Sequence, residues 1–252
     1  MARRLFRRKR TPPPLDELGG LADGGLAILD PEGTLIHMTP SRIAASLRYF
    51  LARVQLHDSQ GIPARLALTS ALAGEGVTYV TRSIAAAVAY DTEMSVAVVD
   101  FNWRRPKPAA SDGTGDGERQ LGLADVIEDG VSIDDVILPT SNPRLALVPP
   151  GEAPIARRPA LARSERLISV LDEMDSKFDL LLLDLPPVLA TSEAMNLSQL
   201  ADAYVLVVRQ GATSESQVEA ALEELQGGET LGVILNRFHS DIPRRLRRLV
   251  GT

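Results

Sequence analysis

Residues 64–106 constrain the fold of this chain more than any other stretch. An apolar segment at 65–70 is followed by the glycine turn Gly74-Glu75-Gly76, and an alanine-rich segment at 76–90 comes next. A second apolar segment, 96–100, ends at Asp100. This order predicts a strand, a glycine turn, a helix and a second strand, which is the layout of two parallel strands joined by a crossover helix.

The same alternation continues to the end of the chain. Further buried strands are expected at 178–184, 203–208 and 231–235, and further helices at 40–57, 160–176, 191–200 and 213–226. Shorter elements are expected at 121–127, 133–136 and 145–148. Strands that alternate with helices predict an α/β fold, with a mostly parallel, doubly wound sheet between two layers of helices.

Composition divides the chain into three parts. Basic residues, a proline triplet and two glycine pairs predict a mobile lead-in over 1–40, followed by one domain over 41–240 and a basic tail over 241–252. There is no cysteine, which excludes disulfides and cysteine-bound metals. No apolar run approaches the roughly 20 residues of a membrane span. We therefore expect a cytoplasmic chain whose membrane contact is peripheral or through a partner.

Charge is unevenly distributed along the sequence. The net charge is −6, yet residues 1–10 hold six basic residues and residues 244–252 hold four, with no acidic residue in either segment. An acidic body argues against nucleic acid as a partner. The basic decapeptide either contacts anionic lipid, at about 1 kcal/mol per charge, or is a solvated tail.

The glycine turn carries the first chemical prediction. Backbone N–H groups of such a turn, at the positive end of a helix, bind phosphate oxygens, so Gly74, Glu75, Gly76, Val77 and Thr78 are predicted nucleotide-binding residues of a P-loop. The Thr78 hydroxyl is placed to ligate Mg²⁺. Val77 occupies the position of the P-loop lysine, and Ala71 that of the first glycine. The alternative is a helix start that binds no ligand.

Two aspartates at strand ends carry the second prediction. Asp100 follows one apolar strand and Asp184 follows four leucines in another. In open α/β sheets these ends line the ligand crevice, where carboxylates hold Mg²⁺ or act in catalysis. Each aspartate alone could simply cap the next turn. Together with the glycine turn, Thr78, Asp100 and Asp184 are predicted to form a Mg²⁺ site, with the two aspartates as catalytic candidates.

Three motifs resemble those of the bacterial tyrosine kinases of exopolysaccharide and capsule synthesis, the BY-kinases, which belong to the MinD/ParA-like P-loop NTPases. The motifs are TSALAGEGVT at 69–78, VVDFNWRRP at 98–106 and FDLLLLDLPPV at 178–188. The segment LGVILNR at 231–237 is also similar, and the resemblance implies that Asn236 contacts the nucleotide base. The resemblance covers about 60–240.

This resemblance implies ATP or ADP with Mg²⁺ as cofactors. It implies a membrane polysaccharide co-polymerase of the Wzz-like kind as partner, and thus a place at the inner face of the cell membrane. It also implies a homo-oligomer, or a hetero-oligomer with an active paralogue. The family's oligomer-forming ExxRxxR pattern is matched at 45–51 by Arg48 alone.

The departures from the family pattern fall on catalysis and its substrate. Val77 replaces the lysine, whose charge-assisted bonds give about 1.5–3 kcal/mol, and Asn102 replaces the second aspartate of DxDxR. Tyr79 replaces a small residue and is expected to crowd the pocket, and a tyrosine-rich C-terminal tail is absent. These losses predict weak or lost nucleotide binding.

Three functions remain open from the sequence. The preferred one is a pseudokinase that docks on and regulates a membrane polysaccharide co-polymerase. The second is an active ATP-dependent protein tyrosine kinase or ATPase with a variant P-loop, in which Arg82, Arg65, Arg104 or Arg105 replaces the lysine. The third is a MinD/ParA-like organiser that binds membrane or DNA.

Overall fold

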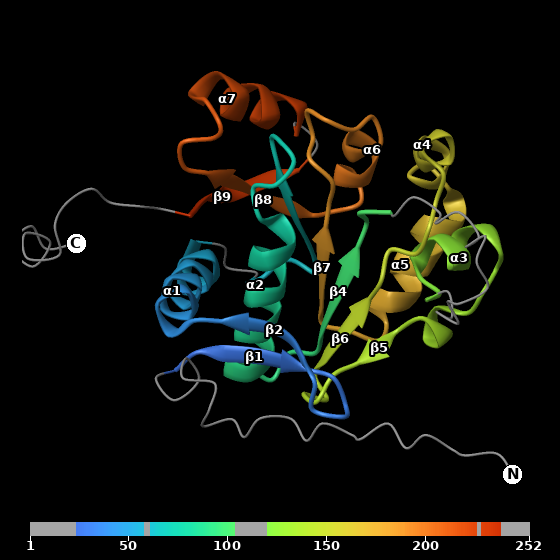
Figure 1. Cartoon of the computed structure of the whole chain (residues 1–252), viewed down its shortest axis with the longest axis horizontal. Helices are drawn as coiled ribbons and strands as arrows, with labels where there is room; N and C mark the ends of the chain where they lie inside the picture. Colours follow the sequence, from blue (N-terminus) through green and yellow to red (C-terminus); the bar gives the residue numbers. More distant parts are fainter. Residues whose placement is uncertain (1–23, 58–60, 104–119, 226–227, 238–252) are drawn as a thin grey trace, which may run out of the picture.

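A computed structural model describes residues 24–57, 61–103, 120–225 and 228–237 (Figure 1). The strands are β1 (Leu26–Leu29), β2 (Leu35–Thr39), β3 (Arg65–Ser70), β4 (Val96–Asp100), β5 (Leu138–Pro139), β6 (Leu145–Val148), β7 (Leu180–Asp184), β8 (Ala203–Arg209) and β9 (Glu229–Asn236). The α-helices are α1 (Ser41–His57), α2 (Val77–Asp91), α3 (Leu123–Glu128), α4 (Arg158–Leu161), α5 (Glu165–Asp175), α6 (Ala194–Ser198) and α7 (Glu215–Glu224). Short 3₁₀ turns occupy Ile133–Asp135 and Ile155–Arg157. Within these ranges, no helix is both long enough and apolar enough to cross a membrane.

A seven-stranded sheet forms the centre of the fold, in the order β5-β6-β4-β7-β3-β8-β9. All neighbouring strands in it are parallel except β5, which pairs antiparallel with β6 at one edge. The predicted mostly parallel α/β sheet is therefore confirmed. Because parallel strands end at the same edge of a sheet, the carboxyl ends of β3, β4 and β7 meet, and the two predicted aspartates lie there.

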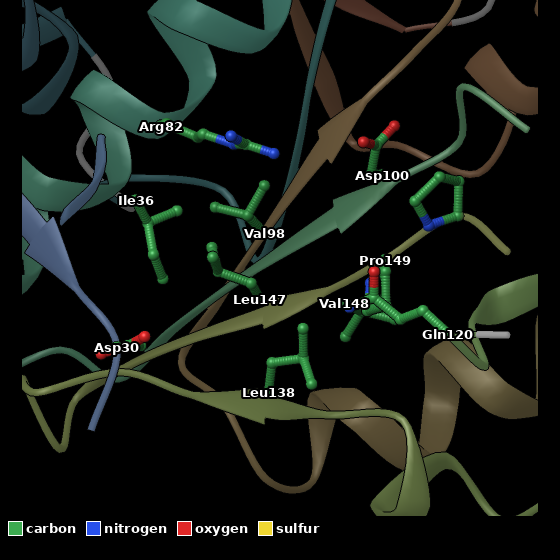
Figure 2. A pocket seen from close by; sticks show the side chains of 11 residues that line it. Asp30, Ile36, Arg82, Val98, Asp100, Gln120, Leu138, Leu147, Val148 and Pro149 are labelled. Carbon is green, nitrogen blue, oxygen red and sulfur yellow. The ribbon is translucent and has the colours of Figure 1, made fainter. Parts of the chain in front are cut away.

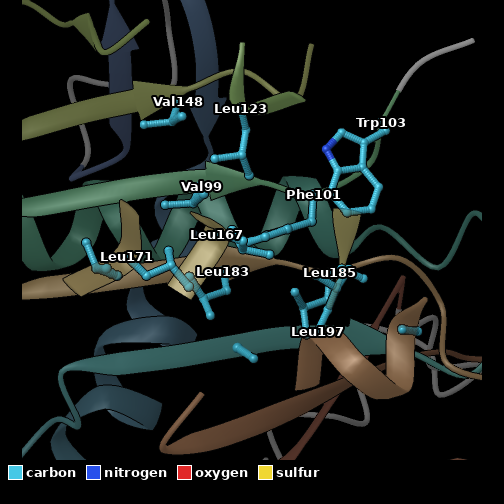
Figure 3. Packing of buried hydrophobic residues seen from close by; sticks show 14 of the residues in the cluster. Val99, Phe101, Trp103, Leu123, Val148, Leu167, Leu171, Leu183, Leu185 and Leu197 are labelled. Carbon is cyan, nitrogen blue, oxygen red and sulfur yellow. The ribbon is translucent and has the colours of Figure 1, made fainter. Parts of the chain in front are cut away.

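Each face of the sheet has its own apolar core. One core lies beneath α1 and α2, and the other beneath α3, α5, α6 and α7. Figure 3 shows side chains of the second core, in which Phe101 and Trp103 continue the row begun by Val99 of β4, with Leu123 of α3 above that row and Leu197 of α6 next to Leu185. Burial on both faces explains why β4 and β7 are continuous apolar runs.

Helix α2 is the element that connects the site to the core. It begins after Gly76, whose φ of 95° lies in the left-handed region that favours glycine. The alanines 85–87 on its buried side are fully inaccessible, and such small side chains allow the helix to lie close against the sheet. The helix thereby holds its first turn firmly at the ends of the strands.

A hairpin of β1 and β2 corrects the expected lead-in over 1–40. The two strands pair antiparallel, from Leu26 opposite Thr39 onward, and the buried Leu26 and Ile28 join the core beneath α1 and α2. The sequence does contain two indications of this hairpin, the Pro31-Glu32-Gly33 turn and the short apolar runs on either side of it. The glycines and prolines of the segment favoured a loop instead. Of the predicted lead-in and tail, residues 1–23 and 238–252 lie outside the described ranges.

The expected single helix over 160–176 is also wrong, because it is two helices. Ser164 interrupts it and caps α5, where its hydroxyl accepts a hydrogen bond from the Arg166 N–H at 3.2 Å. A serine oxygen that accepts from the first turn of a helix is a common helix start.

Candidate functional site

The glycine turn between β3 and α2 lines a pocket of about 230 Å³ at the carboxyl edge of the sheet. Its wall contains 73–78, together with Asn102, Asp184 and Pro187. Gly74, Glu75, Gly76, Val77 and Thr78 thus lie together, as the sequence predicts. We call this cavity the P-loop pocket.

Glu75 anchors the turn through a buried side chain. One carboxylate oxygen accepts from the Leu72 N–H at 2.9 Å, and the other accepts from the Arg209 N–H at 3.1 Å and from the Thr213 hydroxyl. The residue is 1% exposed. Glu75 was predicted as a nucleotide-binding residue, but its side chain ties the turn to the loop after β8, and its carboxylate is thereby occupied.

Asn236, at the end of β9, closes the other side of the turn. Its amide nitrogen donates to the Glu75 carbonyl at 2.7 Å. A Cβ on Gly76 would collide with that same nitrogen, so only glycine fits there without movement. The structure therefore brings Asn236 to the P-loop, and its contact with a nucleotide base stays a prediction.

Asp100 and Asp184 are opposite residues of β4 and β7. Asn102 connects them, because its side-chain amide donates to the Asp100 carboxylate at 3.0 Å and to the Asp184 carbonyl at 3.2 Å. The Asn102 N–H also donates to the Asp100 carboxylate, at 2.8 Å. Asn102 thus holds the two strand ends together, a role that the sequence did not predict.

Asp184 is the most unusual ionisable group of the site. It is fully buried, and neither carboxylate oxygen has a hydrogen-bond partner within the described ranges. Burial raises the pKa of Asp184 to about 7, and the negative charge of Asp100 adds to the rise. Thr78, Arg82 and Asn102 lower the pKa in part, although neither Thr78 nor Asn102 makes a well-formed bond to the carboxylate.

The orphaned carboxylate of Asp184 fits a cation. A buried carboxylate without a partner is unfavourable, and a divalent ion with oxygen ligands would satisfy it. Thr78 lines the same pocket and Asp100 is the cross-strand neighbour of Asp184, so the predicted Mg²⁺ residues lie together. No group of three or more acidic or histidine side chains suited to a metal occurs in the described ranges. Phosphate oxygens would have to complete the coordination.

Val77 leaves the P-loop pocket without a basic side chain. It is buried and lines the pocket, and among the described lining residues none is lysine, arginine or histidine. Arg65 lies at the opposite end of β3, where it pairs with Asp172 and Asp175. Arg82 lines a different cavity, described below. Arg104 and Arg105 lie outside the described ranges.

The expectation that Tyr79 crowds the nucleotide pocket is wrong. Its ring packs edge-on against His37 of the hairpin, with ring centroids 4.8 Å apart, and it does not line the P-loop pocket. Tyr79 lies in the first turn of α2, on the side of the helix that contacts β2. The contact with His37 depends on the β1–β2 hairpin, which was not predicted from the sequence.

Relatives of the chain are tyrosine-protein kinases. Tyrosine-protein kinase CpsD of Streptococcus agalactiae is 27% identical over 180 residues, covering 70% of this chain and 76% of that protein. Tyrosine-protein kinase Wzc of Salmonella typhimurium is 29% identical over 173 residues, covering 68% of this chain and 23% of that protein. No protein-family model matches the chain.

Solved structures agree with these relatives. The VpsO kinase domain is 26% identical with a TM-score of 0.64, covering 78% of this chain and 95% of that one. The kinase domain of the Escherichia coli tyrosine kinase ETK has a TM-score of 0.67 at 23% identity, covering 80% and 78%. MinD of Pyrococcus horikoshii, a complex with Mg-ADP, has a TM-score of 0.51 at 20% identity, covering 75% and 77%. The chain is therefore a homologue of the bacterial tyrosine kinases, and its fold is that of their kinase domains and of the MinD/ParA-like P-loop proteins.

Proposed function

We propose that this chain is a pseudokinase of capsule or exopolysaccharide synthesis, which uses a kinase fold to regulate a membrane polysaccharide co-polymerase. The observation that carries the proposal is the P-loop pocket, in which the lysine position is Val77 and no described lining residue is basic. The scaffold around it is retained, since the glycine turn is anchored by Glu75 and Asn236.

The energetic consequence of Val77 is large. A lysine there would make charge-assisted hydrogen bonds to phosphate, each contributing about 1.5–3 kcal/mol. One preorganised donor of this kind changes the rate of a chemical step by about 10²–10³. Val77 supplies neither, and the nearest charges in the pocket wall are carboxylates. A polyphosphate would thus be bound by backbone N–H groups alone, unless a cation accompanies it.

Magnesium is the cation that the remaining residues suit. Thr78, Asp184 and Asp100 would hold it, and when bound it would neutralise phosphate charge. Asn102 is an amide and cannot accept a proton from a hydroxyl, so it cannot serve as general base. We therefore place Asp184 and Asp100 as remnants of a catalytic site, and any bound nucleotide as a structural or regulatory ligand.

The proposed binding partner is inferred from the relatives of the chain, and not from the P-loop pocket. Homologues in this group are named Wzc and EpsB, and this chain covers less than a quarter of their length. We propose that a membrane polysaccharide co-polymerase is the partner of this kinase-like domain. Arg48, the one match to the oligomer pattern, is engaged within the chain through two hydrogen bonds to Asp91, at 2.6 and 3.1 Å. A self-assembled ring that uses Arg48 is therefore disfavoured.

Calorimetric titration tests the loss of nucleotide binding. Mg-ATP and Mg-ADP are titrated into the wild type, into Val77→Lys and into Val77→Met, which is longer but uncharged. We expect a binding heat only when nucleotide is titrated into Val77→Lys. Micromolar binding by the wild type would contradict the proposal. If none of the three proteins binds nucleotide, the missing lysine is not the cause of the lost binding.

Co-purification tests the partner. The chain is expressed with the polysaccharide co-polymerase encoded nearest to it, and complex formation is measured by size-exclusion chromatography in detergent. We expect a complex that forms equally with wild type and Asp184→Asn, because docking does not depend on the site. No complex with any co-polymerase encoded nearby would contradict the docking role.

Arg82 favours one second candidate, an active kinase or ATPase with a variant P-loop. Its positive charge lowers the pKa of Asp184, so its guanidinium acts on the aspartate pair from the second turn of α2. Radiolabelled ATP decides between the candidates. Phosphate release or autophosphorylation by the wild type, lost in both Arg82→Met and Asp184→Asn, would establish the active enzyme and overturn the pseudokinase.

A further inference from the structure

A second cavity lies beside the P-loop pocket and is larger, at about 290 Å³ (Figure 2). The end of β4 separates the two, because Asp100 lines the second cavity while Asn102 lines the P-loop pocket. The hairpin forms one wall through Asp30 and Ile36. We call this cavity the hairpin pocket. Its volume is at the lower end of the range for small-molecule sites.

Arg82 supplies the positive charge of the hairpin pocket. Figure 2 shows its side chain extending from α2 across Val98 into the cavity. Its Nε is buried and has no hydrogen-bond partner, and within the described ranges its guanidinium makes no ion pair. Buried guanidinium N–H groups ordinarily bond to an acceptor, because leaving one unpaired is costly. A ligand with an acceptor oxygen would satisfy this group.

The rest of the wall is largely apolar. Ile36, Val98, Leu138 and Leu147 come from four different strands, and Pro149 and Pro150 close the end beyond β6. These side chains suit a flat or branched hydrocarbon body. Because β2, β4, β5 and β6 are rigid elements, the pocket is preformed rather than made by a loop alone.

The two carboxylates of the wall limit where an anion can lie. In Figure 2, Asp30 lies at the far end of the cavity from Arg82, and Asp100 lies on the side nearest β7. Asp100 already accepts two hydrogen bonds from Asn102 on one oxygen, and Asp30 accepts one from the Thr34 N–H at 2.6 Å. Negative charge on the ligand is therefore favourable only at Arg82.

We propose that the hairpin pocket binds a small organic anion, with its carboxylate or phosphate on the Arg82 guanidinium and its apolar body on Val98, Leu147 and Ile36. The ligand is a free small molecule, since a cavity of about 290 Å³ holds roughly one or two rings. This proposal does not depend on the pseudokinase proposal, because none of its residues except Asp100 belongs to the predicted nucleotide site.

Methyl NMR with matched probes tests the pocket. The full chain, labelled at Ile, Leu and Val methyl groups, is titrated with benzoate, phenyl phosphate, the neutral isostere benzamide and inorganic phosphate. We expect millimolar binding, with shifts at Ile36, Leu138 and Leu147, by benzoate, by phenyl phosphate or by both. Comparison of these two distinguishes a carboxylate ligand from a phosphate ester. Equal binding of benzamide, equal binding of inorganic phosphate, or shifts confined to the glycine turn would each overturn the proposal.

Variants test whether the Arg82 guanidinium is the group that binds the anionic probe. Arg82→Met is expected to weaken the better probe at least tenfold, as loss of a charge-assisted bond predicts, while Arg53→Met on the exposed side of α1 binds as the wild type. If Arg82→Met does not fold, Leu138→Glu at the half-exposed rim adds a repelling carboxylate, with Ile168→Glu on α5 as its control. Unchanged affinity in the folded Arg82→Met, or in Leu138→Glu, would overturn the proposal.

Discussion

Asp100 and Asp184 stand opposite each other on β4 and β7, yet their carboxyl groups have different surroundings. Asp100 accepts two hydrogen bonds from Asn102, whereas Asp184 is fully buried and its carboxylate oxygens have none from the described residues. Burial of Asp184 and the negative charge of Asp100 both disfavour the ionised form of Asp184, so its carboxyl group stays protonated to a higher pH. This asymmetry makes the site a source of pH-dependent stability.

We expect Asp184→Asn to stabilise the protein at alkaline pH. The pKa of Asp184 is about 7 in the folded protein and about 3.9 when unfolded, so its contribution to stability is present below pH 4 and is lost as the pH rises through 7. The variant should gain about 2–4 kcal/mol over wild type at pH 8.5 and almost nothing at pH 4. Urea unfolding in EDTA, followed by the fluorescence of the single tryptophan, Trp103, measures this.

The exposed Asp129→Asn, at the end of α3, is the matched control for the loss of a surface carboxylate. Equal stability differences of Asp184→Asn at pH 4 and pH 8.5 would contradict the raised pKa of Asp184.

His37 is expected to make stability depend on pH in the direction opposite to that of Asp184, at acid pH. Burial and then the positive charge of Arg82 lower the pKa of His37 to about 4, from 6.5. The folded protein therefore binds fewer protons than the unfolded chain between these values, and stability falls as the pH drops from 6.5 to 4, by roughly 1–3 kcal/mol. His37→Gln should remove this fall while keeping a hydrogen bond to Ser83, which His37 contacts at 2.9 Å.

The His37 effect is best measured in the Asp184→Asn background, since the two slopes oppose each other over this pH range in the wild type. The measurement is the urea midpoint from pH 4.5 to 7. Parallel curves for Asp184→Asn and for the double variant would show that His37 is not buried as a neutral ring.

Gly76→Ala should be more destabilising than Gly74→Ala. Both glycines have a positive φ, 95° and 82°, so alanine at either position costs about 1–3 kcal/mol of backbone strain. Only at Gly76 would the added Cβ also collide, with the Asn236 amide, whereas no atom lies within 4 Å of a Cβ at Gly74. Thermal unfolding of both variants measures the difference.

Shortening Asn236 isolates the collision. In the Asn236→Ala background, we expect the extra cost of Gly76→Ala over Gly74→Ala to shrink to near zero. If the extra cost persists in this background, the collision is not its cause.

Glu75→Gln should loosen the glycine turn. The amide can replace only one of the two acceptor oxygens, and its NH₂ group would face a backbone N–H, so a cost of about 1–3 kcal/mol is expected. Thr213→Val removes the hydroxyl that donates to Glu75, and the two changes should be non-additive by at least about 0.5 kcal/mol. Glu93→Gln, at a highly exposed carboxylate, is the control. Additive effects on the urea midpoint would show that Glu75 and Thr213 do not interact.

The sequence predicts the parts of the site that depend on local order along the chain. The apolar runs before Asp100 and Asp184 and the glycine turn before α2 are each contiguous, so their positions at the ends of parallel strands follow from the fold class. The sheet itself follows from the same alternation. What the sequence predicts poorly is the direction of side chains that depend on distant partners.

Three residues illustrate this limit. The Glu75 carboxylate anchors the turn because its partners, Arg209 and Thr213, come from the other half of the chain. Tyr79 packs on His37 because the hairpin covers α2 there. Charge and a place one helical turn after Thr78 suggest Arg82 as a substitute for the P-loop lysine, and the structure shows that it lines another cavity, which the hairpin helps to form. Long-range packing, rather than propensity, decides all three.

The tie between Asn236 and the Glu75 carbonyl has a consequence for synthesis on the ribosome. The glycine turn appears early in the nascent chain, but the groups that anchor it, the Arg209 N–H and the side chains of Thr213 and Asn236, come more than 130 residues later. At about 5–20 residues per second, several seconds pass before these groups emerge. Until then the glycine turn lacks its anchoring hydrogen bonds. A chain truncated before β9 would contain residues 74–78 without all of the contacts that hold the loop in shape.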